Sequence, residues 1–187
     1  MPRMWVLSAA GSDRPGIVAQ VTKALYALGC NLEDSAMTRL GGEFAIMLVC
    51  SSAASLTPRK LEAALSPLAA RLRLSIHTKP LSAGDMAHRP LGRPYTISVY
   101  GSDRPGIVYR ISELLARRRI NISDLSTRRT SPANAGGASG RASLYQMMIE
   151  VELPPGVSAP AVERALRQLA KRLRVEVRLQ PVDTAIL

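Results

Sequence analysis

The chain has very little of the side-chain chemistry on which most catalytic and metal sites depend. It contains two cysteines and two histidines among 187 residues. Cys30 and Cys50 both fall in the first half at unrelated positions, which argues against a disulfide framework and a zinc site. His77 falls in an expected strand and His88 between the two halves, and neither makes a plausible general base. We therefore expect no enzymatic activity, no bound metal and no cofactor.

Long apolar runs are also missing. No stretch is long enough to span a bilayer, and the N-terminal MPRMWVLSAAGSDRPG has only a short apolar run, unlike a secretory signal. We therefore expect a cytoplasmic protein without a membrane partner.

Basic residues outnumber acidic ones, with 25 Lys and Arg against 14 Asp and Glu and a net charge of +11. Such a balance favours acidic partners. Aromatic residues, which would stack on nucleic-acid bases, make up only 4% of the chain. The alternative is a set of solvated, arginine-rich helix faces. Arg117, Arg118 and Arg119 fit this alternative, because they fall at the expected end of a helix, where cations complement the helix dipole.

The octet GSDRPGIV occurs twice, at residues 11–18 and 101–108. The two halves of the chain match at an offset of 90 up to Asp34 and Asp124, and at an offset of 101 from Phe44 and Tyr145 onward. The second copy thus carries an insertion near the Gly/Ala/Ser-rich residues 131–141, which we expect to form a mobile loop. We predict two domains, residues 1–80 and 95–187, joined by a proline-containing linker at 81–94.

Each copy predicts the element order βαββαβ. In the first copy, a short apolar strand at 4–10 precedes a helix from residue 17, and strands at 31–40 and 43–50 flank the hairpin pair Gly41-Gly42. Thr57 is expected to cap a second helix with Pro58 in its first position, and a last strand follows from residue 74. The second copy predicts elements at 95–100, 107–118, 121–130, 144–153, 158–173 and 175–179. Both copies are therefore expected to be α+β, ferredoxin-like sandwiches.

The expected strand FAIMLVC, residues 44–50, is apolar at every position. In a ferredoxin-like sandwich the helices cover only one face of the sheet, so we expect the second face to pack against the sister domain or a second chain. A homodimer or higher homo-oligomer is the corresponding expectation.

The repeated turn joins a buried strand to the start of a helix, where free backbone N–H groups and the helix dipole favour an anion such as a carboxylate. Gly11 allows a close backbone approach, Asp13 is expected to cap the helix, and Pro15 to fix its first turn. The aspartate would repel a bare phosphate and attract an ammonium group. The alternative is a strand-to-helix turn without a ligand.

The octet, together with NLED at 31–34 and NISD at 121–124 inside βαββαβ, resembles the ACT domain, a regulatory module that binds amino acids. The resemblance covers nearly all of both halves. It implies a small amino acid, glycine or a similar one, held between paired ACT domains by the loop after the first strand and by the asparagine. The implied ligand-binding residues are Gly11, Ser12, Asp13, Pro15, Gly16, Ile17 and Asn31 in the first copy and Gly101, Ser102, Asp103, Pro105, Gly106, Ile107 and Asn121 in the second.

The asparagines have an alternative role as residues that end the preceding helix in a left-handed conformation. Asn31 follows Gly29-Cys30, whereas Asn121 follows Arg119-Ile120. Because the glycine is replaced in the second copy while the amide persists, we favour use of the asparagine in ligand binding or at an interface. The same replacement indicates that the two sites are not equivalent, and one of them could be lost.

Among ACT proteins, a freestanding tandem pair with DRPGIV is similar to repressors of transcription that have no DNA-binding fold of their own. The resemblance implies contact with a DNA-bound activator of glycine cleavage genes, in a manner sensitive to glycine. Two alternatives remain. One is direct nucleic-acid binding, suggested by the charge and by Arg128-Arg129 on an expected strand. The other is an amino-acid sensor that regulates an enzyme.

Overall fold

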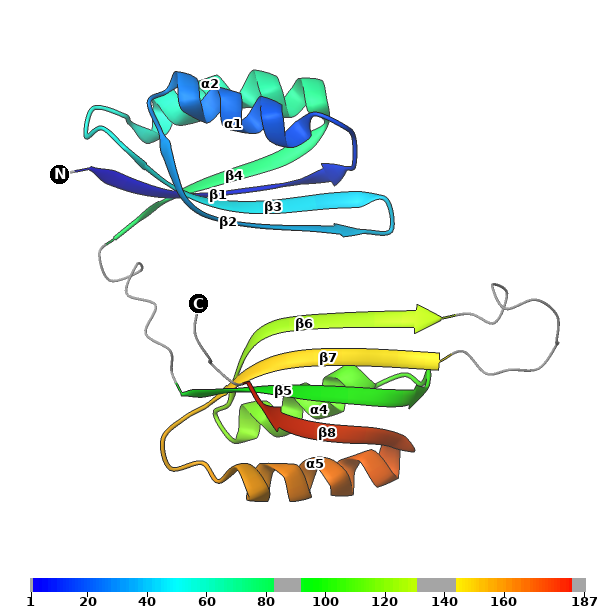
Figure 1. Ribbon diagram of the computed structural model, residues 1–187. Coiled ribbons are helices and arrows are strands. Elements are labelled where there is room, and N and C mark those ends of the chain that lie inside the picture. The colour runs from blue at the N-terminus through cyan, green and yellow to red at the C-terminus, as the bar shows by residue number, and fades with distance from the viewer. Residues whose placement is uncertain (1, 83–91, 131–143, 183–187) are drawn as a thin grey trace, which may run out of the picture. The chain divides into compact units, whose positions relative to one another are not determined.

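Two copies of one βαββαβ arrangement make up the structure, a computed structural model (Figure 1). It describes residues 2–82, 92–130 and 144–182. The chain divides into two units, Met1–His88 and Arg89–Leu187. Most of the expected linker and the whole of the expected loop at 131–141 lie outside the described residues.

The first unit is a four-stranded antiparallel sheet with two helices. Its strands have the spatial order β2-β3-β1-β4, and β1 pairs with both β3 and β4. Alternate residues of β1 and β3, together with one stripe of each helix, form a continuous core that includes Trp5, Leu7, Leu25, Leu48 and Leu61. The elements are β1 (Arg3–Ser12), α1 (Ile17–Ala27), β2 (Asn31–Leu40), β3 (Glu43–Ser52), α2 (Pro58–Leu72) and β4 (Leu74–Leu81).

The second unit repeats this plan with the strand order β6-β7-β5-β8 and its own core around Ile97, Ile111, Leu115, Met147 and Ile149. Its elements are β5 (Arg93–Ser102), α4 (Ile107–Arg117), β6 (Asn121–Thr130), β7 (Leu144–Leu153), α5 (Ala159–Leu173) and β8 (Val175–Pro181). The predicted ferredoxin-like fold is confirmed in both copies.

The helix starts are only partly as expected. The Thr57 hydroxyl accepts a hydrogen bond from the Lys60 backbone N–H at 3.3 Å, and Pro58 opens α2, as predicted. By contrast, α1 begins after Gly16 and α4 after Gly106, and no side chain caps either helix. The prediction that Asp13 and its twin cap these helices is wrong, because a glycine with positive φ redirects the chain before the first helical residue.

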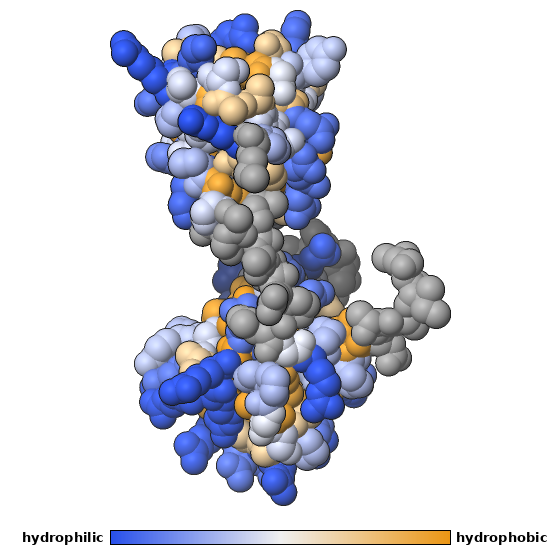
Figure 2. All heavy atoms as spheres, turned by 90° about the vertical axis from the view of Figure 1, so that its left-hand side faces the viewer, coloured by the Kyte–Doolittle hydropathy of each residue, from blue (hydrophilic) through white to orange (hydrophobic). Residues whose placement is uncertain are grey.

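Within each unit both helices cover the same face of the sheet (Figure 1). The opposite face is open, and in β3 it exposes 54% of Met47 while Phe44, Ile46 and Leu48 are buried. Figure 2 shows mostly hydrophilic residues on the visible surface of each unit, with smaller hydrophobic patches among these residues. Among the described residues, no helix combines the length and the hydropathy needed to cross a membrane.

Candidate functional site

Gly11 and Gly101 lie near the ends of the first strand of each unit, where a neighbouring strand approaches closely. A Cβ atom on Gly11 would lie 2.6 Å from the Arg73 carbonyl oxygen, and one on Gly101 would lie 2.9 Å from Val175 Cγ1. Both distances are shorter than van der Waals contact allows. The close approach of β4 and β8 therefore requires glycine at these positions. The sequence predicted a close backbone approach at Gly11, although not which strand makes it.

The second glycine of each octet bends the backbone into the helix. Gly16 has φ of 89° and Gly106 of 92°, and each carbonyl accepts the first hydrogen bond of its helix, at 3.0 Å and 2.9 Å. The N–H groups of the first helical turn have no partner within the helix and carry the positive end of its dipole. An anion can be held at this point of either unit.

The other residues of the octet differ in burial, since the isoleucines are buried and the prolines and serines are exposed. Ile17 and Ile107 are 2% and 1% exposed, so their side chains anchor the helix in the core and only their backbone faces the turn. Pro15 and Pro105 are exposed and precede the N-cap glycine. The prediction that they fix the first helical turn is therefore wrong. Ser12 is exposed and donates to Glu43 Oε1 at 3.4 Å; Ser102 is exposed as well.

The aspartate of each octet forms an ion pair with an arginine of the second strand. Asp13 Oδ2 lies 3.1 Å from Arg39 NH1, and Asp103 Oδ2 lies 3.1 Å from Arg129 NH1. The Asp13 N–H also donates to the Gly42 carbonyl at 2.9 Å. Neither ion pair was predicted, since Arg129 was considered only for nucleic-acid binding and Arg39 was not singled out, although the separation of 26 residues recurs in both copies. The ion pairs hold the carboxylates beside the helix starts.

Each turn thus combines both signs of charge at one place. The helix start and the guanidinium are positive, and the aspartate, which keeps a second oxygen outside the ion pair, is negative. Asp13 and Asp103 side chains are 29% and 34% exposed, so a small solute can reach them. Such a site suits a zwitterion with its carboxylate toward the N–H groups and its ammonium toward the aspartate.

The structure does not bring Asn31 to the turn of its own unit. Gly11 lies opposite Phe44 in the sheet, whereas Asn31 lies opposite Ser51, seven residues further along β3. At roughly 3.3 Å per residue, Gly11 and Asn31 are therefore about 23 Å apart along the direction of β3. Asn121 is separated from Gly101 in the same way along β7.

Asn31 and Asn121 begin strands β2 and β6, so neither ends the preceding helix. Gly29, with φ of 69°, and Arg119, with φ of 55°, adopt the left-handed conformation instead. The alternative that each asparagine ends the preceding helix in a left-handed conformation is therefore wrong.

The surroundings of the two asparagines differ. The Asn31 amide donates to Glu33 Oε1 at 3.2 Å, and hydrogen bonds from Ser51 and Asn31 lower the pKa of Glu33. The second copy has Ser123 at the position of Glu33. Asn31 also lines a hollow of about 560 Å³ between α1 and β2, together with Thr22 and other residues.

Comparison with known proteins gives the family. Family models described as ACT domain match residues 3–79 and 95–171. The glycine cleavage system transcriptional repressor of Escherichia coli is 31% identical over 179 residues, which cover 95% of this chain and 90% of the repressor, and the repressor of Shigella flexneri matches equally. A crystal structure of an unknown protein from Galdieria sulphuraria is 31% identical with a TM-score of 0.78, over 97% of this chain and 99% of that one. The chain therefore belongs to the ACT-domain family, as two ACT domains in tandem that align over nearly their whole length with the Escherichia coli repressor.

Proposed function

We propose that the protein is a non-enzymatic, cytoplasmic regulator of transcription that responds to glycine or a similar small amino acid. The observation that carries the proposal is the 31% identity to a glycine cleavage system transcriptional repressor over 95% of this chain. We propose residues 1–80 and 95–187 as the bounds of the two ACT domains. The regulator acts by contact with a DNA-bound activator of glycine cleavage genes.

The amino acid binds at the octet turns. Its carboxylate accepts hydrogen bonds from the N–H groups at the start of α1 or α4, and its ammonium group lies against Asp13 or Asp103. The pairing of each aspartate with an arginine at 3.1 Å supports this assignment, because it fixes the carboxylate without using both of its oxygens. Gly16 and Gly106 supply the backbone bend, which their positive φ angles would make costly for any other residue.

Asn31 and Asn121 complete the site in a homodimer. About 23 Å separates each asparagine from the turn of its own unit, so a single unit cannot use both for one small ligand. We propose that a second copy of the chain supplies the asparagine. The exposed apolar residues on the open sheet faces, among them Met47 and Met148, support association of this kind.

Ligand binding would change the affinity for the activator by linkage. An amino acid shifts the balance between two assemblies only by the difference in its affinity for them, typically about 1–3 kcal/mol. Direct nucleic-acid binding is less well supported, because Arg129, one of the two arginines that suggested it, is paired with Asp103.

A thermal-shift panel across the proteinogenic amino acids tests the proposal. Glycine or a similar small amino acid at about one hundred times its dissociation constant should stabilise the protein by about 2.7 kcal/mol. A flat panel would contradict the proposal. A gel shift with the purified protein alone is the companion experiment, and tight, sequence-selective retardation of DNA at physiological salt would favour direct nucleic-acid binding instead.

A further inference from the structure

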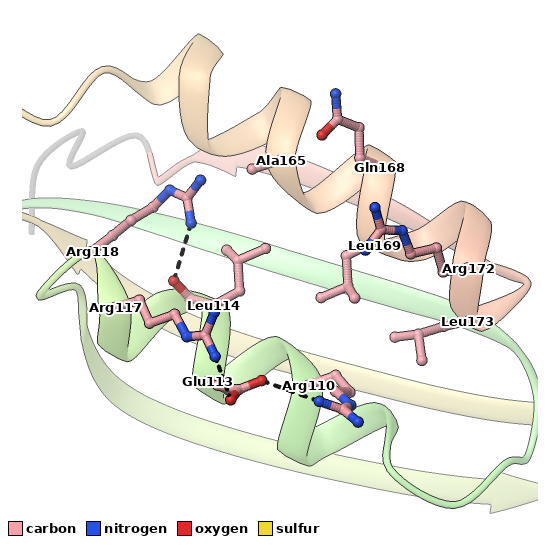
Figure 3. Close-up of a pocket in the computed structure, with 10 residues that line it drawn as sticks. All are labelled: Arg110, Glu113, Leu114, Arg117, Arg118, Ala165, Gln168, Leu169, Arg172 and Leu173. Carbon is pink, nitrogen blue, oxygen red and sulfur yellow. Dashed lines mark hydrogen bonds and ion pairs between the residues drawn. The ribbon is translucent and has the colours of Figure 1, made fainter.

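The two helices of the second unit border a groove on the side away from the sheet. The groove has a volume of about 590 Å³ and lies between α4 and α5 (Figure 3). Leu114 of α4 and Leu169 and Leu173 of α5 point into the space between the helices and are only half-buried. The floor of the groove is therefore apolar and accessible.

Arginines surround this floor. Arg110, Arg117 and Arg118 come from α4 and its C-cap, and Arg172 comes from α5, while Glu113 is the one acidic residue in the lining. Glu113 is held by Arg117 at 2.8 Å and by Arg110 at 3.5 Å. Burial acts to raise the pKa of Glu113, but the hydrogen bond from Tyr109 and the charges of Arg117 and Arg110 outweigh it and lower that pKa. The groove thus keeps an excess of positive charge.

The first unit shows that this groove is not a necessary result of the fold. At the positions of Arg110, Arg117 and Arg118 it has Gln20, Ala27 and Leu28. There the guanidinium of Arg71 on α2 donates to Gln20 Oε1 on α1 at 2.8 Å and ties the two helices together.

The leucines of the two units differ accordingly. Leu68 and Leu72 of the first unit are buried, at 7% and 9% exposure, whereas their counterparts Leu169 and Leu173 are half-buried. Arg110 pairs with Glu113 on its own helix, and as a cation without an acceptor it cannot take the hydrogen bond from Arg172 that Gln20 takes from Arg71. The open, basic groove is a property of the second unit.

We propose that this groove is the docking site for an acidic, leucine-containing segment of a partner protein. Apolar side chains of the segment enter between Leu114, Leu169 and Leu173, and its carboxylates pair with Arg117 and Arg172 on the two rims. From Arg110 to Arg118 the groove follows about 12 Å of helix, which corresponds to about two turns of a helical segment. The inference rests on the proposed function only in that it names the surface and the chemistry of a protein partner.

The apolar floor is the reason to favour a protein segment over nucleic acid. A phosphate backbone would use the arginines but would leave three leucines exposed to water or to sugars. An amphipathic acidic segment satisfies the charges and covers the leucines at the same time. Removal of a leucine should therefore weaken the binding of a protein partner and leave the binding of a nucleic acid unchanged.

The test uses the full chain and a fluorescein-labelled peptide of about 12 residues, with leucine at every third or fourth position and glutamate between, which as a helix is about 18 Å long and extends past both ends of the groove. Fluorescence polarisation at low salt measures its binding. The charge variant is Arg117→Ala with Arg172→Ala, and the matched control is Arg59→Ala with Lys60→Ala, which removes the same charge from α2. The apolar variant is Leu114→Ala, which introduces the residue of the first unit, Ala24.

We expect the charge variant to weaken binding about tenfold and the control to leave it unchanged. Leu114→Ala should weaken binding several-fold, and a peptide with glutamine in place of glutamate should not bind. Failure of the acidic peptide to bind, or equal losses in the charge variant and its control, would overturn the proposal. So would tighter binding of a labelled DNA duplex that depends on the arginines and ignores Leu114.

The same variants separate this proposal from the amino-acid site. The charge variant should keep the thermal shift produced by glycine, because neither Arg117 nor Arg172 is among the residues assigned to the octet turn. If the charge variant loses peptide binding and keeps its response to glycine, the groove is a site distinct from the octet turns. If the wild type responds to glycine and does not bind the peptide, the groove proposal fails and the proposed function still stands.

Discussion

Replacement of Gly11 by alanine tests the role of the octet in the fold most sharply. The new Cβ would lie 2.6 Å from the Arg73 carbonyl oxygen and 2.9 Å from Leu74 Cδ2. Leu74 can move its side chain, but the carbonyl belongs to the junction of α2 and β4. There Arg73 has φ of 55° and its N–H is bonded to the last turn of α2. The junction must shift, at a cost of about 2 kcal/mol, within the range of roughly 1–3 kcal/mol for overpacking.

Urea unfolding followed by tryptophan fluorescence measures this cost. Trp5 is the single tryptophan of the chain and is 1% exposed in the core of the first unit, so its emission reports the unfolding of that unit. With a slope of about 1 kcal/mol per molar urea for a small domain, the midpoint should fall by about 2 M. The control is Ser12→Ala on the exposed next residue, which should leave the midpoint nearly unchanged. A Gly11→Ala midpoint equal to the wild-type value would refute the close approach as the reason for this glycine.

Two further predictions concern the first core. Ser52→Ala leaves the buried Trp5 indole N–H, which now donates to Ser52 Oγ at 2.9 Å, without a partner, and should lower the free energy of unfolding by about 1–3 kcal/mol; an unchanged urea midpoint would count against that hydrogen bond. Burial, with the neighbouring Cys30 and Glu33, raises the pKa of Cys50 to about 12 from an ordinary value of 9.0. The unfolded chain therefore loses this proton first, so the free energy of unfolding should fall as the pH rises above 9.0. The free energy of unfolding of the Cys50→Ala variant should fall less over the same pH range. Equal pH profiles for the wild type and this variant would contradict the prediction.

Much of the fold could be predicted because its signals are local. The hairpin at Gly41-Gly42 needs two positive φ angles, and the structure has 59° and 86° there. The cap at Thr57 is a contact between residues three apart. The first strand was predicted too short, since β1 continues to Ser12 by pairing with β3, and sheet pairing is not a local property.

The candidate site was predictable only in part for the same reason. The close backbone approach at Gly11 and Gly101 was predicted correctly, whereas the bend at Gly16 and Gly106 was not predicted. The partner of Asp13 was missed, because Arg39 reaches it through the register of β3 on β1, which no nearby residue specifies. The distance of Asn31 from the turn follows from the same register and could not be read from the order of the residues.

The most direct test of the central claim is isothermal titration of glycine into the wild-type protein and into the double variant Asp13→Ala with Asp103→Ala, with Glu62→Ala as a control for the loss of an exposed carboxylate. If the octet turns hold the amino acid, the wild type and the control should bind glycine with the same affinity, and the double variant should lose at least tenfold, about 1.4 kcal/mol. Undiminished binding of glycine by the double variant would contradict the assignment of the ligand to these turns.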